Sequence, residues 1–301
     1  MRAISAGVLA LGILAATPAG AMQQSPEYVP TTDSEDIVVT AEREVLRSFV
    51  AELSQPNPHE DQIARWDSRV CLRVAGLDQR HGQYLVDRIA ARAHELGLRP
   101  AAPGCRANVV IFVTRDADMI ASAIADDHDL VAYYNNAEFG NALGRAELQQ
   151  FASTDAPVRW WFVSHTADRS GRPIPTGGMV GSPGSRLQSA VRQDFNRVLI
   201  VVDAQQAQGV RFDALADYLS MVSLAQLDPA ADTSGFPTIL NLFSDRASGQ
   251  AGPASMTEWD TAYLEGLYRA PRNASSARQQ RWSITNRMQR ELTPPEDGQS
   301  R

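Results

Sequence analysis

The sequence predicts an α/β or α+β fold, in which a mixed sheet is flanked by helices, and three observations support this prediction. Short apolar runs alternate along the chain with stretches that repeat apolar residues at helical spacing. The run at 108–114 (NVVIFVT) is apolar almost throughout, as expected for a strand covered on both faces. Of the 301 residues, 44% are hydrophobic and 21% are charged, which provides for a sizeable core and excludes disorder of the whole chain.

The first half of the chain predicts a strand–helix–strand unit. Residues 37–40 are expected to form a short strand and residues 41–53 a helix. A strand at 69–75, a helix at 83–96 that ends at Gly97, and a strand at 108–114 follow. Strands separated by a helix of this length run parallel and are joined by a right-handed crossover.

The rest of the chain predicts two more strands and four helices. A helix capped by Asp116 extends to about residue 125, and strands are expected at 158–164 and 196–203. The glycine-rich stretch Gly177–Gly184 lacks lysine and opens no strand-to-helix unit, so it is interpreted as a hairpin loop. The three C-terminal helices are expected at 212–227, 256–268 and 275–292.

The N-terminus has the features of a secretory signal peptide. Arg2 precedes an apolar run at 4–16, and Ala19 and Ala21 form an A-x-A cleavage site. The run of 13 residues is shorter than the roughly 20 that a membrane-spanning helix needs. The sequence therefore predicts a signal peptide at 1–21, a flexible leader at 22–37, one globular domain at 38–292 and a polar tail at 293–301. After cleavage we expect a periplasmic protein without an integral membrane segment, with secretion as the alternative.

The stretch IVVTAERE, which begins at Ile37, resembles the short N-terminal segment of outer-membrane receptors energised through TonB. The remaining chain is too short for the barrel and plug of such a receptor. The resemblance leaves one functional alternative, a cell-envelope assembly factor.

The two cysteines, Cys71 and Cys105, both follow the predicted cleavage site. An even number of cysteines in an exported protein favours pairing. A metal site needs more ligands than two thiols, and a catalytic pair is more closely spaced. The sequence predicts a disulfide between them.

Charge and motif searches exclude several classes of protein. The net charge of −7 argues against a nucleic-acid partner. No two of the five histidines lie three to five residues apart, and the chain contains neither G-x-S-x-G nor G-x-G-x-x-G. No cofactor is therefore expected. Several aspartates lie near predicted strand ends and are interpreted as caps, with a carboxylate catalytic pair as the alternative: Asp116, Asp118, Asp126, Asp127, Asp129 and Asp203.

The segment that begins at Leu215, LADYLSMVSLAQLDPAADTSGFPTILNLF, resembles the zincin metalloproteases. It is more similar to uncharacterised exported bacterial proteins whose C-terminal half is zincin-like. The resemblance covers 196–268 and implies an edge strand, a long helix, a loop, TILNLF in place of the methionine turn, and a closing helix.

The resemblance also implies a degenerate site. Laid on H-E-x-x-H-x-x-G-x-x-H, the first histidine falls at Ala216, the glutamate at Asp217, the second histidine at Ser220 and the third histidine at Gln226. None of the residues at the histidine positions suits zinc, so no metal is expected. If the scaffold is retained, these four residues lie together at the floor of a cleft.

These expectations favour an exported, noncatalytic, pseudoenzyme-like protein that binds an unknown protein or peptide partner in the cell envelope. A metal-independent periplasmic hydrolase or peptidase on the same scaffold is the first alternative, and the assembly factor is the second.

Overall fold

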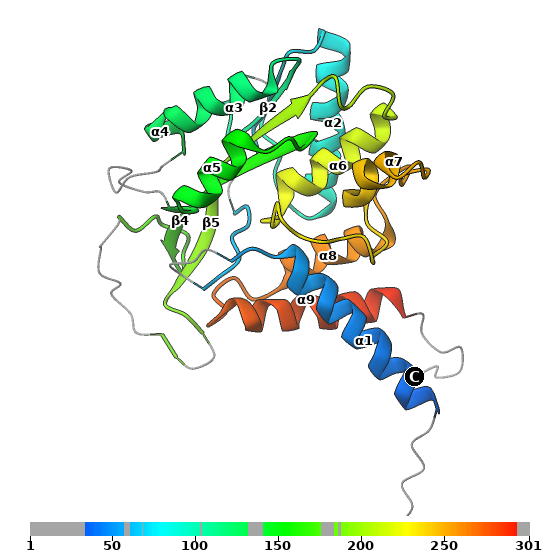
Figure 1. The fold of residues 1–301 in the computed structure, drawn as a ribbon. Helices are drawn as coiled ribbons and strands as arrows, with labels where there is room; N and C mark the ends of the chain where they lie inside the picture. The colour runs from blue at the N-terminus through cyan, green and yellow to red at the C-terminus, as the bar shows by residue number, and fades with distance from the viewer. Residues whose placement is uncertain are drawn as a thin grey trace, which may run out of the picture.

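The computed structural model describes most of the chain (Figure 1). The described residues are 34–56, 61–67, 69–102, 104–131, 141–175, 184–185 and 188–293. Their helices are α1 (Ser34–Leu53), α2 (Gln79–Glu95), α3 (Ala117–Asp126), α4 (His128–Val131), α5 (Arg145–Ser153), α6 (Phe212–Leu224), the 3₁₀ helix η1 (Ile239–Asn241), α7 (Leu242–Ala247), α8 (Glu258–Arg269) and α9 (Ala277–Leu292). Their strands are β1 (Leu72–Ala75), β2 (Val109–Thr114), β3 (Asn141–Ala142), β4 (Val158–Asp168) and β5 (Val191–Asp203).

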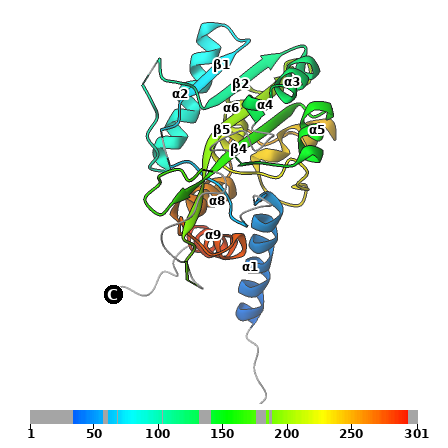
Figure 2. The same cartoon turned by 90° about the vertical axis from the view of Figure 1, so that its left-hand side faces the viewer.

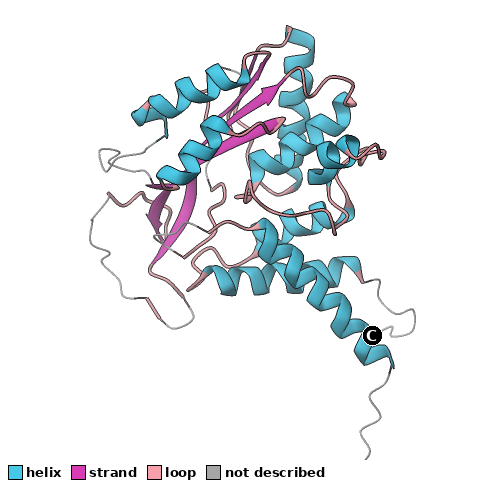
Figure 3. Ribbon diagram, viewed as in Figure 1, coloured by secondary structure: helices cyan, strands magenta, loops and turns pink. Residues whose placement is uncertain are grey.

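The strands form one mixed sheet, drawn in magenta in Figure 3, in the order β1-β2-β5-β4-β3. β1, β2 and β5 are parallel, whereas β4 is antiparallel to both β5 and β3. The predicted strand–helix–strand unit is present as β1–α2–β2, with Leu72 paired to Val109. The predicted fold class, a mixed sheet flanked by helices, is confirmed.

Helices cover both faces of the sheet (Figures 1 and 2). Because successive side chains of a strand point to opposite faces, β5 contributes to two separate cores. Val198 and Ile200 pack with residues of α2 and α6, whereas Leu199 and Val201 pack with residues of α3 and α5. The first core continues into α1, α8 and α9, which lie at the end of the sheet where β5 begins.

The predicted strand at 37–40 is wrong, because these residues belong to α1, which is continuous from Ser34 to Leu53. The run IVVT is β-branched, but β-branching costs a helix less than about 0.7 kcal/mol per residue. The helix-forming sequence that follows, and its buried face of Phe49, Val50 and Leu53, outweigh this cost.

The expected edge strand at 196–203 is also wrong in its position. β5 lies in the middle of the sheet, with β2 on one side and β4 on the other. From Val198 to Val202 its side chains are buried on both faces, as is typical of a central strand.

Residues 61–67 lie between α1 and β1 in the chain, and residues 62–66 are buried. Ile63, Ala64 and Trp66 have exposures of 1% or less. The amide of Gln280 bonds both backbone groups of Ile63, at 2.7 and 3.1 Å. The guanidinium of Arg65 donates to the carbonyls of Leu267 and Ala270 at the end of α8, and burial lowers its pKa to about 10. This segment therefore joins α8, α9 and the sheet.

The expected signal peptide, most of the leader and nearly all of the polar tail lie outside the described residues, as does most of Gly177–Gly184. Among the helices that are described, none combines the length and the apolar character needed to cross a bilayer.

Candidate functional site

Cys71 and Cys105 form a disulfide, with their Cα atoms 6.1 Å apart, as predicted. Cys71 directly precedes β1, and Cys105 lies in the loop before β2. The side chain of Asn108 strengthens the same connection, because its Oδ1 accepts from the Cys71 N–H at 2.7 Å. The disulfide fixes the loop before β2 against the amino end of β1.

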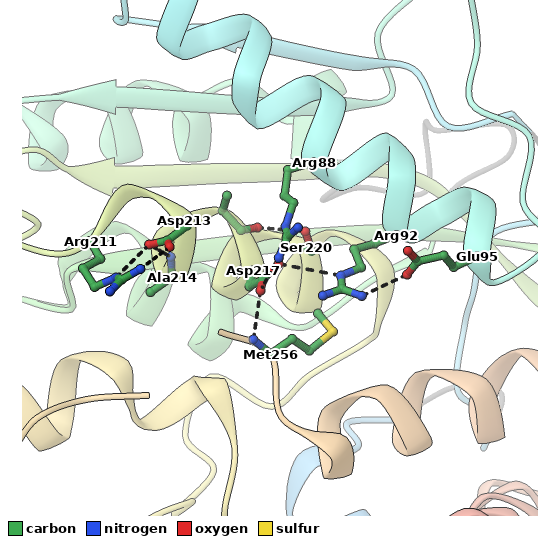
Figure 4. A network of polar contacts seen from close by, with 10 residues as sticks. Arg88, Arg92, Glu95, Arg211, Asp213, Ala214, Asp217, Ser220 and Met256 are labelled. Atoms are coloured by element: carbon green, nitrogen blue, oxygen red, sulfur yellow. Dashed lines mark hydrogen bonds and ion pairs between the residues drawn. The ribbon is translucent and has the colours of Figure 1, made fainter. Parts of the chain in front are cut away.

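Asp217, the residue at the glutamate position of the zincin motif, lies on α6 with a fully buried side chain (Figure 4). Arg88 of α2 donates to both carboxylate oxygens, from Nε at 2.7 Å and from Nη2 at 2.9 Å. The backbone N–H of Met256 donates to Oδ2 at 2.9 Å, and Nε of Arg92 lies 3.7 Å from Oδ1. The carboxylate therefore holds α2 and the segment before α8 against α6.

The electrostatic environment keeps Asp217 ionised. Burial alone raises the pKa of this carboxyl, but the hydrogen bonds from Arg88 and Met256 and the positive charges of Arg88 and Arg92 outweigh burial. The net result is a pKa below the ordinary value for aspartate. The same pairing raises the pKa of Arg88. An ionised carboxylate engaged by three donors is a structural anchor and a poor general base.

The other three motif positions are also in the interior. Ala216 and Ser220 share a face of α6, where the Ser220 hydroxyl donates to the Ala216 carbonyl at 2.8 Å. α6 ends at Leu224, three residues before the predicted end, because the carbonyls of Ser223 and Leu224 are bonded by Trp66 Nε1 and the Tyr268 hydroxyl. Gln226 therefore lies beyond the helix, where its Oε1 accepts from the Ala64 N–H at 2.6 Å.

The four positions are thus close in sequence but do not form an open site. The cavities described below are lined by other residues. Among the described residues, no group of three or more histidine, cysteine, aspartate or glutamate side chains is arranged to hold a metal ion.

The most enclosed hollow beside α6 is an aromatic groove that the sequence analysis did not predict. It consists of two adjoining cavities of about 130 and about 400 Å³. The two cavities share five lining residues, three of them aromatic: Pro157, Trp160, Tyr218, Pro229 and Phe243. Tyr218 follows Asp217 directly on α6, and its ring meets that of Phe243 edge-on, with centroids 5.3 Å apart. The Asp217 anchor therefore also fixes the turn of α6 that carries Tyr218.

The wall of this groove also contains polar side chains. The hydroxyl of Tyr218 belongs to a residue that lines both cavities. Burial raises the pKa of Tyr218, so the group remains a neutral donor. The other polar side chains of the smaller cavity are Gln55, Glu147, Gln150, Thr154 and Arg159, and those of the larger one are Gln206, Asp228, Thr233 and Ser244. A largely apolar hollow with a few polar groups is typical of a binding pocket.

The smaller cavity follows one edge of β4. Four consecutive strand residues line it, from Val158 to Trp161. β5 pairs with this segment on one side, whereas β3, the only described neighbour on the other side, pairs only with Val163 and Ser164. The Asp203 N–H donates to the Pro157 carbonyl, so by antiparallel alternation the backbone groups of Val158 and Trp160 point away from β5.

The signal for this groove in the sequence is the aromatic pair in VRWWFVS together with Pro157. The sequence does not show that Tyr218 and Phe243, far along the chain, complete the wall.

Comparisons with protein-family models, with curated proteins and with solved structures found no match to this chain, so its fold and its groove are interpreted from their own geometry.

Proposed function

We propose that this protein is an exported, noncatalytic binding protein that takes up an extended apolar segment of a cell-envelope polypeptide in the aromatic groove. The observation that carries this proposal is the edge of β4 along the smaller cavity, which pairs with no strand among the described residues. An extended peptide can add to such an edge through backbone hydrogen bonds, while pockets for its side chains provide specificity.

The size and chemistry of the groove support an apolar side chain as its occupant. A dry cavity of about 150 Å³ lined by apolar side chains holds a molecule the size of benzene. The smaller cavity, at about 130 Å³, suits one aromatic or large aliphatic side chain. The larger cavity beside it, at about 400 Å³, accommodates the neighbouring residues.

The state of Asp217 supports the noncatalytic part of the proposal. The metalloprotease resemblance requires a carboxylate that is free to activate water. In Asp217 this carboxylate is bound by Arg88 and the Met256 N–H and lies near Arg92. Asp217 does not line any of the five cavities. Both observations agree with a protein that keeps α6 for packing and uses the aromatic groove for binding.

The direct test of the groove is Phe243→Ala. Phe243 is partly exposed and contributes to both cavities, so its truncation removes an aromatic wall without emptying the core. We expect the affinity for short dye-labelled apolar peptides, measured by fluorescence anisotropy, to fall about tenfold or more, as for a truncated aromatic contact.

The matched control is Phe212→Ala, which removes a partly exposed phenylalanine at the start of the same α6 helix, where it contacts His81 and Tyr84. This variant is expected to bind the peptides like the wild type. Equal losses in the two variants, or intact binding in Phe243→Ala, contradict the groove. If mass spectrometry shows that the wild type cleaves the peptides with turnover, this result contradicts the noncatalytic assignment.

Export is tested separately. The apolar run and the A-x-A site predict that the mature chain begins at Met22. Mass spectrometry of the protein made in its own cells is expected to show this N-terminus in the periplasmic fraction. A chain that retains Met1 and sediments with membranes contradicts the prediction.

A further inference from the structure

A separate cavity, of about 450 Å³, lies before the amino end of β2 and beside the middle of β5, at the opposite end of the sheet's parallel strands from the aromatic groove. Its lining contains three basic side chains, two amides and no aspartate or glutamate: Arg106, Ala107, Asn108, His165, Phe195, Asn196 and Arg197. In a chain with a net charge of −7, a hollow lined in this way is a local concentration of positive charge.

The two arginines of this cavity are Arg106 and Arg197. Within the described part of the chain, neither Arg106 nor Arg197 lies within ion-pair distance of a carboxylate. The side chain of Arg197 donates from Nη1 to the Leu130 carbonyl at 2.9 Å. Burial, and then the positive charge of Arg106, lower the pKa of Arg197, and Asp127 opposes this only in part. The two guanidiniums are therefore close enough to repel each other.

His165 adds an unused polar atom. Its Nδ1 is buried and has no hydrogen-bond partner among the described residues. Burial and the nearby charge of Arg192 lower the pKa of His165, so the imidazole is neutral at pH 7. A neutral imidazole supplies either a donor or an acceptor to a ligand, whichever tautomer the ligand selects.

The loop that carries Arg106 is fixed before any ligand arrives. Cys105, its neighbour, is bonded to Cys71, and Asn108 bonds both the Cys71 N–H and the Arg69 carbonyl, at 2.7 and 2.8 Å. The carbonyl of Asn108 also accepts from the Val198 N–H at 2.8 Å. A site held in this way loses little conformational entropy on binding.

We propose that this cavity binds the phosphate group of a small soluble molecule between Arg106 and Arg197. A phosphate group carries a charge of about −1.5 to −2 at pH 7, which matches two guanidiniums that form no ion pair with a carboxylate among the described residues. The planar fork of arginine suits the oxygens of phosphate. A ligand with a single carboxylate neutralises only one of the two guanidinium charges. This proposal is independent of the peptide groove, since the two sites share no lining residue.

The experiment is a calorimetric titration of the whole mature protein with inorganic phosphate at low ionic strength, with acetate in parallel. We expect saturable one-to-one binding of phosphate and much weaker binding of acetate. Arg106→Gln is expected to weaken phosphate binding at least tenfold, as for a lost charge-assisted hydrogen bond. Because Arg106 is exposed, this variant keeps the fold.

The matched control is Arg115→Gln, which removes another exposed arginine, beyond the opposite end of β2. It is expected to leave phosphate binding unchanged. The absence of saturable binding, equal losses in the two variants, or acetate binding as tight as that of phosphate overturns the proposal. Binding to vesicles that contain phosphatidic acid, without binding of free phosphate, also overturns it, because general surface charge explains such a result.

Discussion

Replacement of Asp217 by alanine is expected to lower the free energy of unfolding by about 3 kcal/mol, as for removal of one partner from a buried ion pair. The side chain of Asp217 is fully buried, whereas that of Arg88 is 36% exposed, so the effect lies at the lower end for such pairs. The change leaves Arg88 without its carboxylate and the buried Met256 N–H without its acceptor. Urea unfolding measures the loss.

Two variants separate this anchor from a general effect of charge. Asp213→Ala removes an aspartate one turn earlier on α6, whose pair with Arg211 is exposed, and a much smaller loss is expected. Asp217→Asn keeps the shape but removes the charge. Because the pKa of Asp217 is lowered on folding, its stabilisation is present above about pH 4 and is lost as the pH falls through the folded pKa. The stability difference between wild type and Asp217→Asn should narrow on acidification, and a constant difference contradicts the anchor.

Removal of the disulfide in the double variant Cys71→Ser with Cys105→Ser is expected to lower the free energy of unfolding by about 4 kcal/mol on the chain-entropy model. The bond closes a loop of 34 residues that contains β1, α2 and the connection between them. A reductant should destabilise the wild type by a similar amount and leave the double variant unchanged.

A second readout links this bond to the arginine cavity. If the disulfide fixes the loop that carries Arg106, the double variant should also bind phosphate more weakly than the wild type, at a temperature where both are folded. A variant as stable as the wild type contradicts a structural role for the bond. A less stable variant with unchanged phosphate affinity restricts that role to stability.

Local sequence predicts much of the secondary structure. The helices at 83–96 and 275–292 and the apolar runs at 108–114 and 196–203 are found close to their expected places, because their apolar spacing matches one face of a helix or both faces of a central strand. The secondary-structure predictions that are wrong concern positions where contacts with other elements outweigh the local preference. Residues 37–40 have strand propensity but are part of the helix α1, because the rest of that helix packs against the core. The end of α6 depends on hydrogen bonds from Trp66 and Tyr268, which lie far away in the sequence.

The candidate sites show the same division. The sequence alone determines the pairing of Cys71 with Cys105, since only two cysteines are present, and it places Asp217 on a helix within an apolar stripe. It does not determine that Arg88 of α2 reaches Asp217, because that contact joins side chains 129 residues apart through the packing of two helices.

Only the tertiary structure decides which edge of the described sheet borders a cavity, which aromatic side chains line that cavity, and which arginines lie together in the other one. Strand order and long-range charge pairing depend on the simultaneous packing of all elements, whereas helix and strand formation depend on short-range periodicity. The sequence therefore predicts the mixed sheet flanked by helices, and the packing of those elements creates both the aromatic groove and the arginine cavity.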